Sequence, residues 1–331
     1  MILVTGSTGF VGRRVVEALT VAGYSVRALV HTPSRASVLS PYDAEIVSGD
    51  VLDPQSLSRA CDGVGTVVHL VAVLRESGSQ TYRWVNYEGT RNLLESAASA
   101  GVKRIIYASA IGASSDPAIP YLHSRWMAEQ EVAHSPIPQT TIRFSLGFGE
   151  GDEFINVMAA QVKLSPVVPV AGDGRTRFQP IAAEDVARCL VAAYKNDDTT
   201  GRTIEAGGPA YFTYEEILDL IVETLGVTAV KVHVPVPVLR PVVAVLEALV
   251  PRPPVTRQQL RMLNLDYTAD LDGVQTVFGF MPRPMVGNIG YISRIGLGDA
   301  VKINMRVFEK CWKGCMVLAS PQSMPYPSGS K

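Results

Sequence analysis

Three glycines near the start of the chain, Gly6, Gly9 and Gly12, recur every third residue in the segment TGSTGFVG. An apolar run precedes them, and apolar residues at helical spacing follow. Glycine lets the backbone turn tightly and approach an anion, and the next helix presents free N–H groups at its N-terminus. Many dehydrogenases have G-x-G-x-x-G instead. The segment therefore predicts a turn that binds the pyrophosphate of a dinucleotide, with a purely structural turn as the alternative.

The residues after the second predicted strand indicate which dinucleotide would bind. An acid about 20 residues past the glycines typically bonds the ribose 2′-hydroxyl of NAD. No acid lies between Glu17 and Asp43, and His31 and Arg35 occupy this region instead. Cations favour a 2′-phosphate, so the cofactor is expected to be NADP in preference to NAD. A solvated loop charge is the alternative for Arg35.

Alternating strand and helix patterns position these residues. Strands are expected at 1–5, 24–30, 45–53, 66–72, 103–109 and 140–144, and helices at 11–22, 54–61, 85–100 and from 121 onward. This alternation predicts the α/β class, as a Rossmann-type doubly wound parallel sheet with a smaller C-terminal α/β lobe. The binding crevice of such a sheet lies at the carboxyl ends of its strands.

Two polar residues within the predicted strands stand out. Asp50 ends the third strand, where its carboxylate would meet the adenine amino group. His69 lies inside the continuous apolar run of the fourth strand. A histidine in such a run is more often a hydrogen-bonded core residue than a catalyst, and the core role is expected here.

Composition and charge indicate which ligands and which compartment to expect. A net charge of −1 over 331 residues gives no indication of a nucleic-acid partner. The four cysteines are scattered, which fits a reducing compartment, and Cys311 and Cys315 lack the second pair that a zinc site needs. No basic segment precedes the first strand, so no cleavable signal peptide is expected. The predicted location is cytoplasmic.

The predicted domains are interleaved in the sequence. Residues 1–149 and about 179–207 are assigned to the nucleotide-binding domain, and about 150–178 and 208–320 to a smaller substrate or partner lobe. Arg175 and Arg177 are candidates for binding an anionic substrate, and ordinary surface arginines are the alternative. Residues 321–331 are expected to be a disordered tail.

Two segments of the smaller lobe are candidates for a partner surface. Residues 234–255 are apolar, but prolines and charges interrupt them, so a transmembrane helix is excluded and a packed helix is expected. Residues 299–313 combine a basic stripe with an apolar one at helical spacing. For both, the functional alternative is contact with a protein complex or a membrane surface, which would place the protein peripherally at the inner face of a membrane.

The chain resembles the extended or atypical short-chain dehydrogenases/reductases, which are similar to NAD-dependent epimerases and dehydratases. The resemblance covers about residues 1–280 and rests on these segments in order: TGSTGFVG, GDVLDP, VVHLVA, VNYEGTRNLLE, RIIYASAIGA, YLHSRWMAE, FQPIAAEDVA and EAGGPAYFTYEEI. Within this superfamily it most resembles the branch that includes an accessory subunit of respiratory complex I and its bacterial relatives. Residues 234–263 resemble the C-terminal segment of that branch.

The resemblance implies a role for each matching residue. Around the pyrophosphate it places the three glycines with Ser7, Thr8, Phe10 and Val11. It places Asp50 and Val51 at the adenine, and Leu70, Val71 and Ala72 along the nicotinamide ribose. Asn86 would bond backbone near the site, Ser109 would orient the substrate oxygen, and Tyr121 would be the general acid/base.

The departure from the family pattern is Arg125, which stands where the Tyr-x-x-x-Lys motif has lysine. On a helix, Tyr121 and Arg125 share one face. Arginine can lower the tyrosine pKa and bind ribose hydroxyls, but it cannot relay a proton because it does not deprotonate in proteins. Two functions follow: an oxidoreductase or sugar-nucleotide epimerase that uses Tyr121, or a non-catalytic nucleotide-binding accessory subunit or redox sensor whose cofactor is structural.

Overall fold

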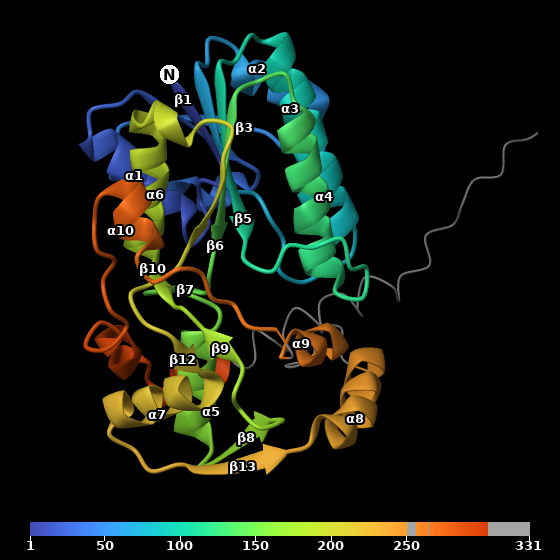
Figure 1. Ribbon diagram of the computed structural model, residues 1–331, viewed down its shortest axis with the longest axis vertical. Coiled ribbons are helices and arrows are strands. Elements are labelled where there is room, and N and C mark those ends of the chain that lie inside the picture. The colour runs from blue at the N-terminus through green and yellow to red at the C-terminus, as the bar shows by residue number, and fades with distance from the viewer. Residues whose placement is uncertain (250–255, 264, 304–331) are drawn as a thin grey trace, which may run out of the picture.

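A seven-stranded parallel sheet forms the centre of the upper part of Figure 1. The computed structural model describes residues 1–249, 256–263 and 265–303. The spatial order of the strands is β11-β6-β5-β4-β1-β2-β3. Their bounds are β1 (Ile2–Thr5), β2 (Val26–Val30), β3 (Ala44–Ser48), β4 (Thr66–His69), β5 (Arg104–Ala110), β6 (Gln139–Phe144) and β11 (Thr203–Ala206). The predicted Rossmann-type fold class is confirmed.

Helices cover both faces of this sheet (Figure 1). One face carries α1 (Gly12–Val21), α6 (Ala183–Lys195) and α10 (Gly273–Phe278), and the other carries α2 (Pro54–Cys61), α3 (Gly89–Ser99) and α4 (Pro120–His134). Successive strand residues point to opposite faces. In β1, Ile2 and Val4 therefore join the apolar cluster around α1 and α6, and Leu3 joins the cluster around α2 and α3.

The sheet order reverses at β1, which lies between β2 and β4. Ligands of doubly wound folds bind at the carboxyl ends of the strands on either side of such a switch point. The glycine segment leaves β1 at this edge, and the connection after β4 passes beside it. The predicted fourth strand, residues 66–72, stops at His69, because Leu70 and Val71 leave the sheet to pass the glycine turn.

Other local predictions differ in detail. Asp53 caps α2, since its carboxylate accepts the Gln55 N–H at 3.0 Å. The helix expected from residue 85 begins as a π-helical turn, η2 (Tyr82–Glu88), and continues as α3. Two short 3₁₀ segments complete this part of the chain, η1 (Pro33–Leu39) and η3 (Asp197–Thr199).

A second group of elements lies at the carboxyl edge of the sheet, and we call it the second lobe (Figure 1). It contains α5 (Ile155–Leu164), β8 (Val167–Ala171), β9 (Arg177–Phe178), β12 (Phe212–Thr213), α7 (Tyr214–Leu225), β13 (Val230–Val234), α8 (Val236–Leu249), α9 (Arg257–Met262) and η4 (Gly290–Arg294). β7 (Gly147–Phe148) and β10 (Ile181–Ala182) join it to the sheet. Its apolar core includes Phe148, Ile155, Phe178, Ile217 and Tyr267.

The two candidate partner segments are only partly described. The helix expected within 234–255 is α8, which begins at Val236 and contains Pro241. Residues 250–255, most of the 299–313 segment, both tail cysteines and the 321–331 tail lie outside the described residues. In the part of the chain that is described, no helix has the length and apolar character needed to cross a membrane.

Candidate functional site

The glycine turn leaves little or no room for side chains at its three glycines. Gly6 has φ +69°, a conformation that L side chains rarely adopt. A Cβ on Gly12 would lie 2.0 Å from the Gly6 carbonyl oxygen, and one on Gly9 would lie 3.1 Å from the same atom. The turn therefore folds tightly against the start of α1. In α1, the Arg13 and Arg14 N–H groups already donate to the Gly9 and Val11 carbonyls, at 3.2 and 3.0 Å. The positive end of the helix dipole favours an anion beside this turn.

Hydrogen bonds fix this turn to the neighbouring strand β2. Ser7 is fully buried, and its hydroxyl donates to the Leu29 carbonyl of β2 at 2.8 Å. The Gly9 N–H donates to the Gly6 carbonyl at 3.0 Å. Ser7 thus anchors the turn to β2, while Thr8 is only partly buried. Phe10 and Val11 are also partly buried and lead into α1.

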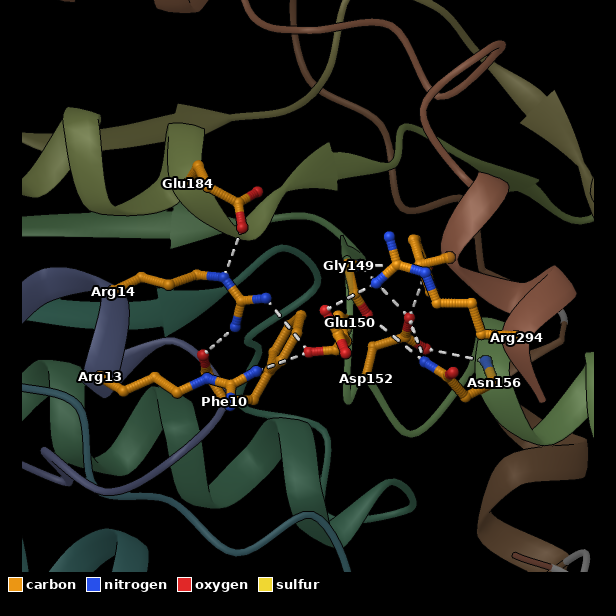
Figure 2. A network of polar contacts seen from close by, with 10 residues as sticks. Phe10, Arg13, Arg14, Gly149, Glu150, Asp152, Asn156, Glu184 and Arg294 are labelled. Atoms are coloured by element: carbon orange, nitrogen blue, oxygen red, sulfur yellow. Dashed lines mark hydrogen bonds and ion pairs between the residues drawn. The ribbon is translucent and has the colours of Figure 1, made fainter. Parts of the chain in front are cut away.

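Two arginines at the start of α1, Arg13 and Arg14, hydrogen-bond around the glycine turn (Figure 2). The sequence alone did not identify them as part of the site. Arg14 is buried and donates to the Phe10 carbonyl at 2.7 Å and to the Glu184 carboxylate of α6 at 2.6 Å. Both arginines also donate to the Glu150 carbonyl, at 2.7 Å from Arg13 and 3.1 Å from Arg14. The sequence feature that could have identified these arginines is their position directly after Gly12. The turn is therefore tied to α6 and to the segment that enters the second lobe.

That entering segment is itself fixed by Asp152 (Figure 2). Its carboxylate accepts the Ile155 N–H at 2.6 Å and the Phe154 N–H at 2.9 Å, which caps α5. It also accepts the Tyr291 hydroxyl at 2.8 Å and the Gly149 N–H at 3.3 Å. Burial raises the pKa of Asp152, and these hydrogen bonds offset part of that effect. The Glu150 carbonyl, which accepts from both arginines, therefore lies in a turn that these hydrogen bonds fix.

The predicted adenine and ribose residues come together at the ends of β2 and β3. Nε2 of His31 lies 3.2 Å from the Asp50 carboxylate, and both side chains are substantially exposed. Asp50 also accepts the Leu52 N–H at 3.0 Å. Val51 is buried beside α3, and Arg35 is exposed on η1. This edge therefore presents an imidazole and a carboxylate side by side, with one arginine nearby in sequence.

Asn86 joins the connection after β4 to α4. The connection contains Leu70, Val71 and Ala72. Fully buried Asn86 accepts the Val73 N–H at 2.8 Å and donates to the Ser124 hydroxyl at 3.0 Å, which in turn donates to the Tyr121 carbonyl at 2.7 Å. Asn86 therefore bonds the backbone of the connection after β4 and joins it to α4.

The other predicted site residues meet where β5 contacts α4. Ser109 lies on β5 and is buried, and its Oγ has no hydrogen-bond partner in the described chain. Arg125 is buried on α4, donates to the Ala108 carbonyl and lies over the Tyr107 ring, with 4.8 Å from Cζ to the centroid. Its Nε and Nη1 have no partner among the described residues. Buried polar atoms are nearly always hydrogen-bonded, so these atoms suit a polar ligand.

Tyr121 lies one helical turn before Arg125. Burial raises the pKa of the Tyr121 hydroxyl above its ordinary value, and the Arg125 guanidinium lowers it by less. The arginine thus offsets only part of the burial effect. At neutral pH the hydroxyl stays protonated, which equips it to donate a proton.

His69 has the structural role expected of it. Its ring is fully buried, with Nδ1 2.6 Å from the Thr5 hydroxyl and Nε2 3.0 Å from the Thr90 hydroxyl. The Thr90 hydroxyl donates to the Asn86 carbonyl, so His69 Nε2 must carry the proton and Nδ1 must accept. Burial lowers the pKa of His69 to about 3, so the ring is neutral and joins β1, β4 and α3.

The two arginines considered for an anionic substrate differ in environment. Arg177 is bound by the Asp266 carboxylate through Nε at 2.9 Å and Nη2 at 2.7 Å. The Arg175 side chain is exposed, and the backbone N–H of this residue donates to the Asp173 carboxylate at 3.0 Å. The charge of Arg177 is thus already neutralised within the protein.

The chain is similar to one family model, to proteins of known name and to a solved structure. The family model of the NAD dependent epimerase/dehydratase family matches residues 2–207. Subunit 9 of the NADH dehydrogenase [ubiquinone] 1 alpha subcomplex, mitochondrial, of Arabidopsis thaliana is 28% identical over 80% of this chain and 67% of its own length. Photosystem II assembly factor Ycf39 of Synechocystis is 28% identical over 72% of each chain. The crystal structure of gox2253 superposes with a TM-score of 0.71 and 27% identity, covering 94% of this chain and 99% of that one.

Proposed function

Because the chain belongs to the NAD-dependent epimerase/dehydratase family, we propose that it is an NAD(P)-dependent oxidoreductase that reduces a carbonyl with Tyr121 as proton donor. The observation that carries this proposal is the group of unsatisfied buried atoms, Ser109 Oγ and Arg125 Nε and Nη1, beside Tyr121. Buried donors in folded proteins nearly always have acceptors. A ribose hydroxyl and a substrate oxygen would satisfy them.

The residues present fit a bound dinucleotide. Gly6 and Gly12 shape a turn that a Cβ would fill, and the positive end of the α1 dipole favours the pyrophosphate. His31 and Asp50 stand at the adenosine end, and the Leu70–Ala72 connection runs toward Tyr121. When bound, the nicotinamide supplies the hydride for the carbonyl carbon.

The chain's own groups would perform the rest of the reaction. Ser109 Oγ holds the carbonyl oxygen, and the raised pKa keeps Tyr121 protonated so that it can donate to that oxygen. Arg125 binds the ribose and stabilises negative charge, but it relays no proton because a guanidinium does not deprotonate. Tyr121 must therefore be reprotonated from solvent. An epimerase would need the same groups to accept the proton first, which the raised pKa opposes.

The first experiment is a fluorescence titration of the protein with NADPH and NADH, followed by turnover with a carbonyl panel. The expected result is saturable NADPH binding in the wild type and in Tyr121→Phe, with turnover lost in the variant alone. Retained turnover in Tyr121→Phe would remove this residue from catalysis. Absence of binding by either nucleotide would overturn the proposal.

A preference for NADP over NAD is part of the proposal and rests on the charges at the β2 end. No acid lies between Glu17 and Asp43, and Arg35 is exposed on η1 where a 2′-phosphate could reach it. Arg35→Ala should weaken NADPH binding about tenfold, a typical loss for one charge-assisted contact, and leave NADH binding unchanged. Equal losses for both nucleotides would contradict the preference.

The second candidate function is a nucleotide-binding accessory subunit or redox sensor, located in the cytoplasm or at the inner face of a membrane. Arg125 at the lysine position and the exposed valines of α8, Val238, Val242 and Val245, favour it. This function predicts that NADPH stays bound without being oxidised. It also predicts that Arg125→Lys creates no turnover and that the protein co-sediments with a protein complex or with anionic vesicles.

A further inference from the structure

The side of Tyr121 that faces the second lobe is aromatic and apolar. The Tyr82 ring packs edge-on against the Tyr121 ring, with centroids 5.9 Å apart. Tyr121 also packs on the second-lobe core, where Phe178 and Tyr267 stack with centroids 5.5 Å apart and Phe154 lies 5.5 Å from Phe178. Tyr121 therefore meets the second lobe on an aromatic and apolar side.

Helix α9 covers the same place with uncharged groups. The Gln258 side chain accepts the Tyr121 N–H at 3.3 Å and donates to the Tyr82 hydroxyl at 3.3 Å. Met262 lies one turn further along α9, on the same face as Gln258, and packs on the second-lobe core. Its carbonyl accepts the Tyr267 hydroxyl at 3.0 Å. This face of α9 thus adds an amide and a thioether to the aromatic wall.

Several cations of the second lobe are bound by protein acceptors, whereas Arg175 is exposed. A sugar nucleotide carries a diphosphate, and binding one calls for free arginines or lysines. Arg177 is neutralised by Asp266, and Lys231 lies 2.8 Å from both Glu215 and Asp219. Of the α9 arginines, Arg257 pairs with Glu247 and Arg261 donates to the Ala118 carbonyl. The ionic group that acts on the pKa of Tyr121 is Arg125, on the nucleotide side.

An exposed apolar surface lies next to this face. Helix α8 packs against α9 and exposes Val238, Val242 and Val245 at 57%, 53% and 57%. Their spacing of four and three residues puts them on one side of the helix. An apolar molecule that reaches α8 is therefore already beside the helix that covers Tyr121.

We propose that the carbonyl compound that reaches Tyr121 is uncharged and apolar, of the long-chain or lipid class, and is not a sugar nucleotide. This inference rests on the proposed reductase function for its reaction, while the binding preference belongs to the site itself. Aromatic rings, a methionine and an amide bind such a body by excluding water, and each buried methylene adds affinity.

The test measures binding to the NADP⁺ complex by titration calorimetry, with 2-butanone, 2-hexanone, 2-octanone and UDP-glucose as probes. Affinity should rise about fourfold per added methylene along the ketone series, as expected for burial of apolar surface. UDP-glucose should not bind. Binding of UDP-glucose, or ketone affinities that do not change with chain length, would overturn the proposal.

Three variants locate the binding site. Met262→Lys puts an ammonium group on the α9 face and should weaken 2-octanone binding about tenfold, whereas Met262→Leu should retain it. Arg177→Gln should change nothing, because this arginine is committed to Asp266. Unchanged 2-octanone binding in Met262→Lys would overturn the proposal. NADP⁺ affinity and melting temperature, measured in parallel, show that each variant is folded.

Failure of the proposed function would be seen separately. If the protein binds no nucleotide, the reductase proposal falls. The same ketone series and UDP-glucose titrated into the protein alone then still decide the chemistry of the Tyr121 face. If NADPH binds and the ketone series shows no dependence on length, only the substrate class is wrong.

Discussion

The glycine turn and the Tyr121 region lie on the same edge of the sheet but differ in how their polar groups are satisfied. Around the turn, Ser7, Arg13 and Arg14 all donate to protein acceptors. Around Tyr121, Ser109 Oγ and two nitrogens of Arg125 have no partner in the described chain. The polar side chains of the first region are paired within the protein, whereas the unpaired buried atoms of the second suit a polar ligand. In the proposed function, the first region is the scaffold for the nucleotide and the second is the site of chemistry.

Gly12→Ala is expected to have the largest effect, because it disrupts the glycine turn. The new Cβ would lie 2.0 Å from the Gly6 carbonyl oxygen, which must move. We expect a loss of about 3 kcal/mol of unfolding free energy, typical of severe overpacking, together with loss of NADPH binding. Urea unfolding and fluorescence titration measure the two effects. Gly65→Ala is the control, because the nearest atom to its Cβ would be 3.8 Å away. Normal NADPH affinity in Gly12→Ala would show that the turn is not the nucleotide site.

Arg14→Ala tests whether this arginine, rather than the glycines alone, holds the turn. The variant leaves the Phe10 and Glu150 carbonyls and the Glu184 carboxylate without this donor. The expected cost is about 2 kcal/mol in unfolding free energy, the range for a hydrogen bond to a charged group, with weaker NADPH binding. Arg13→Ala removes one exposed contact to Glu150 and should cost less. The order of the two melting temperatures checks this, and equal values would contradict it.

The pH dependence of stability tests His69, which joins the two regions through Thr5 and Thr90. Its folded pKa is lowered to about 3, and its unfolded pKa is about 6.5. The folded state therefore keeps the ring neutral, so this contribution to stability is complete above pH 6.5 and is lost as the pH falls. Between pH 6 and 4 it changes by about 1.4 kcal/mol per pH unit. Denaturant unfolding of the wild type and His69→Gln should differ by this slope, and parallel curves would refute the assignment.

The smallest expected change in stability is that of Ser109→Ala, and it distinguishes the two regions most directly. Ser109→Ala removes a buried hydroxyl that has no partner among the described residues, so it should stabilise the protein slightly, by about 0.5 kcal/mol. The same variant should reduce carbonyl turnover, because the substrate oxygen loses its donor. Calorimetric melting and NADPH oxidation measure the two. A clear loss of stability would mean that Ser109 has a structural partner. Thr140→Ala is the control, since that buried hydroxyl donates to the Thr199 carbonyl at 3.0 Å and its removal should destabilise.

Much of the fold was predictable because its signals are local. The glycines, the apolar strand runs and the Asp53 cap each act within a few residues, and α1, α2 and the six predicted strands lie close to where the sequence indicated. The end of β4 was misplaced because residues 70–72 are as apolar as a strand but leave the sheet to pass the glycine turn. The role of Arg14 was missed because its acceptors include Glu150 and Glu184, far away in sequence.

The sequence by itself determined the order of elements, the glycine turn and the helical spacing of Tyr121 and Arg125, since periodicity and backbone sterics depend on neighbouring residues. Only the tertiary structure decided that Arg177 is neutralised by Asp266, that burial outweighs Arg125 in setting the pKa of Tyr121, and that α9 covers the site with uncharged groups. These properties depend on desolvation and on pairings between distant segments, which exist only once the chain has packed.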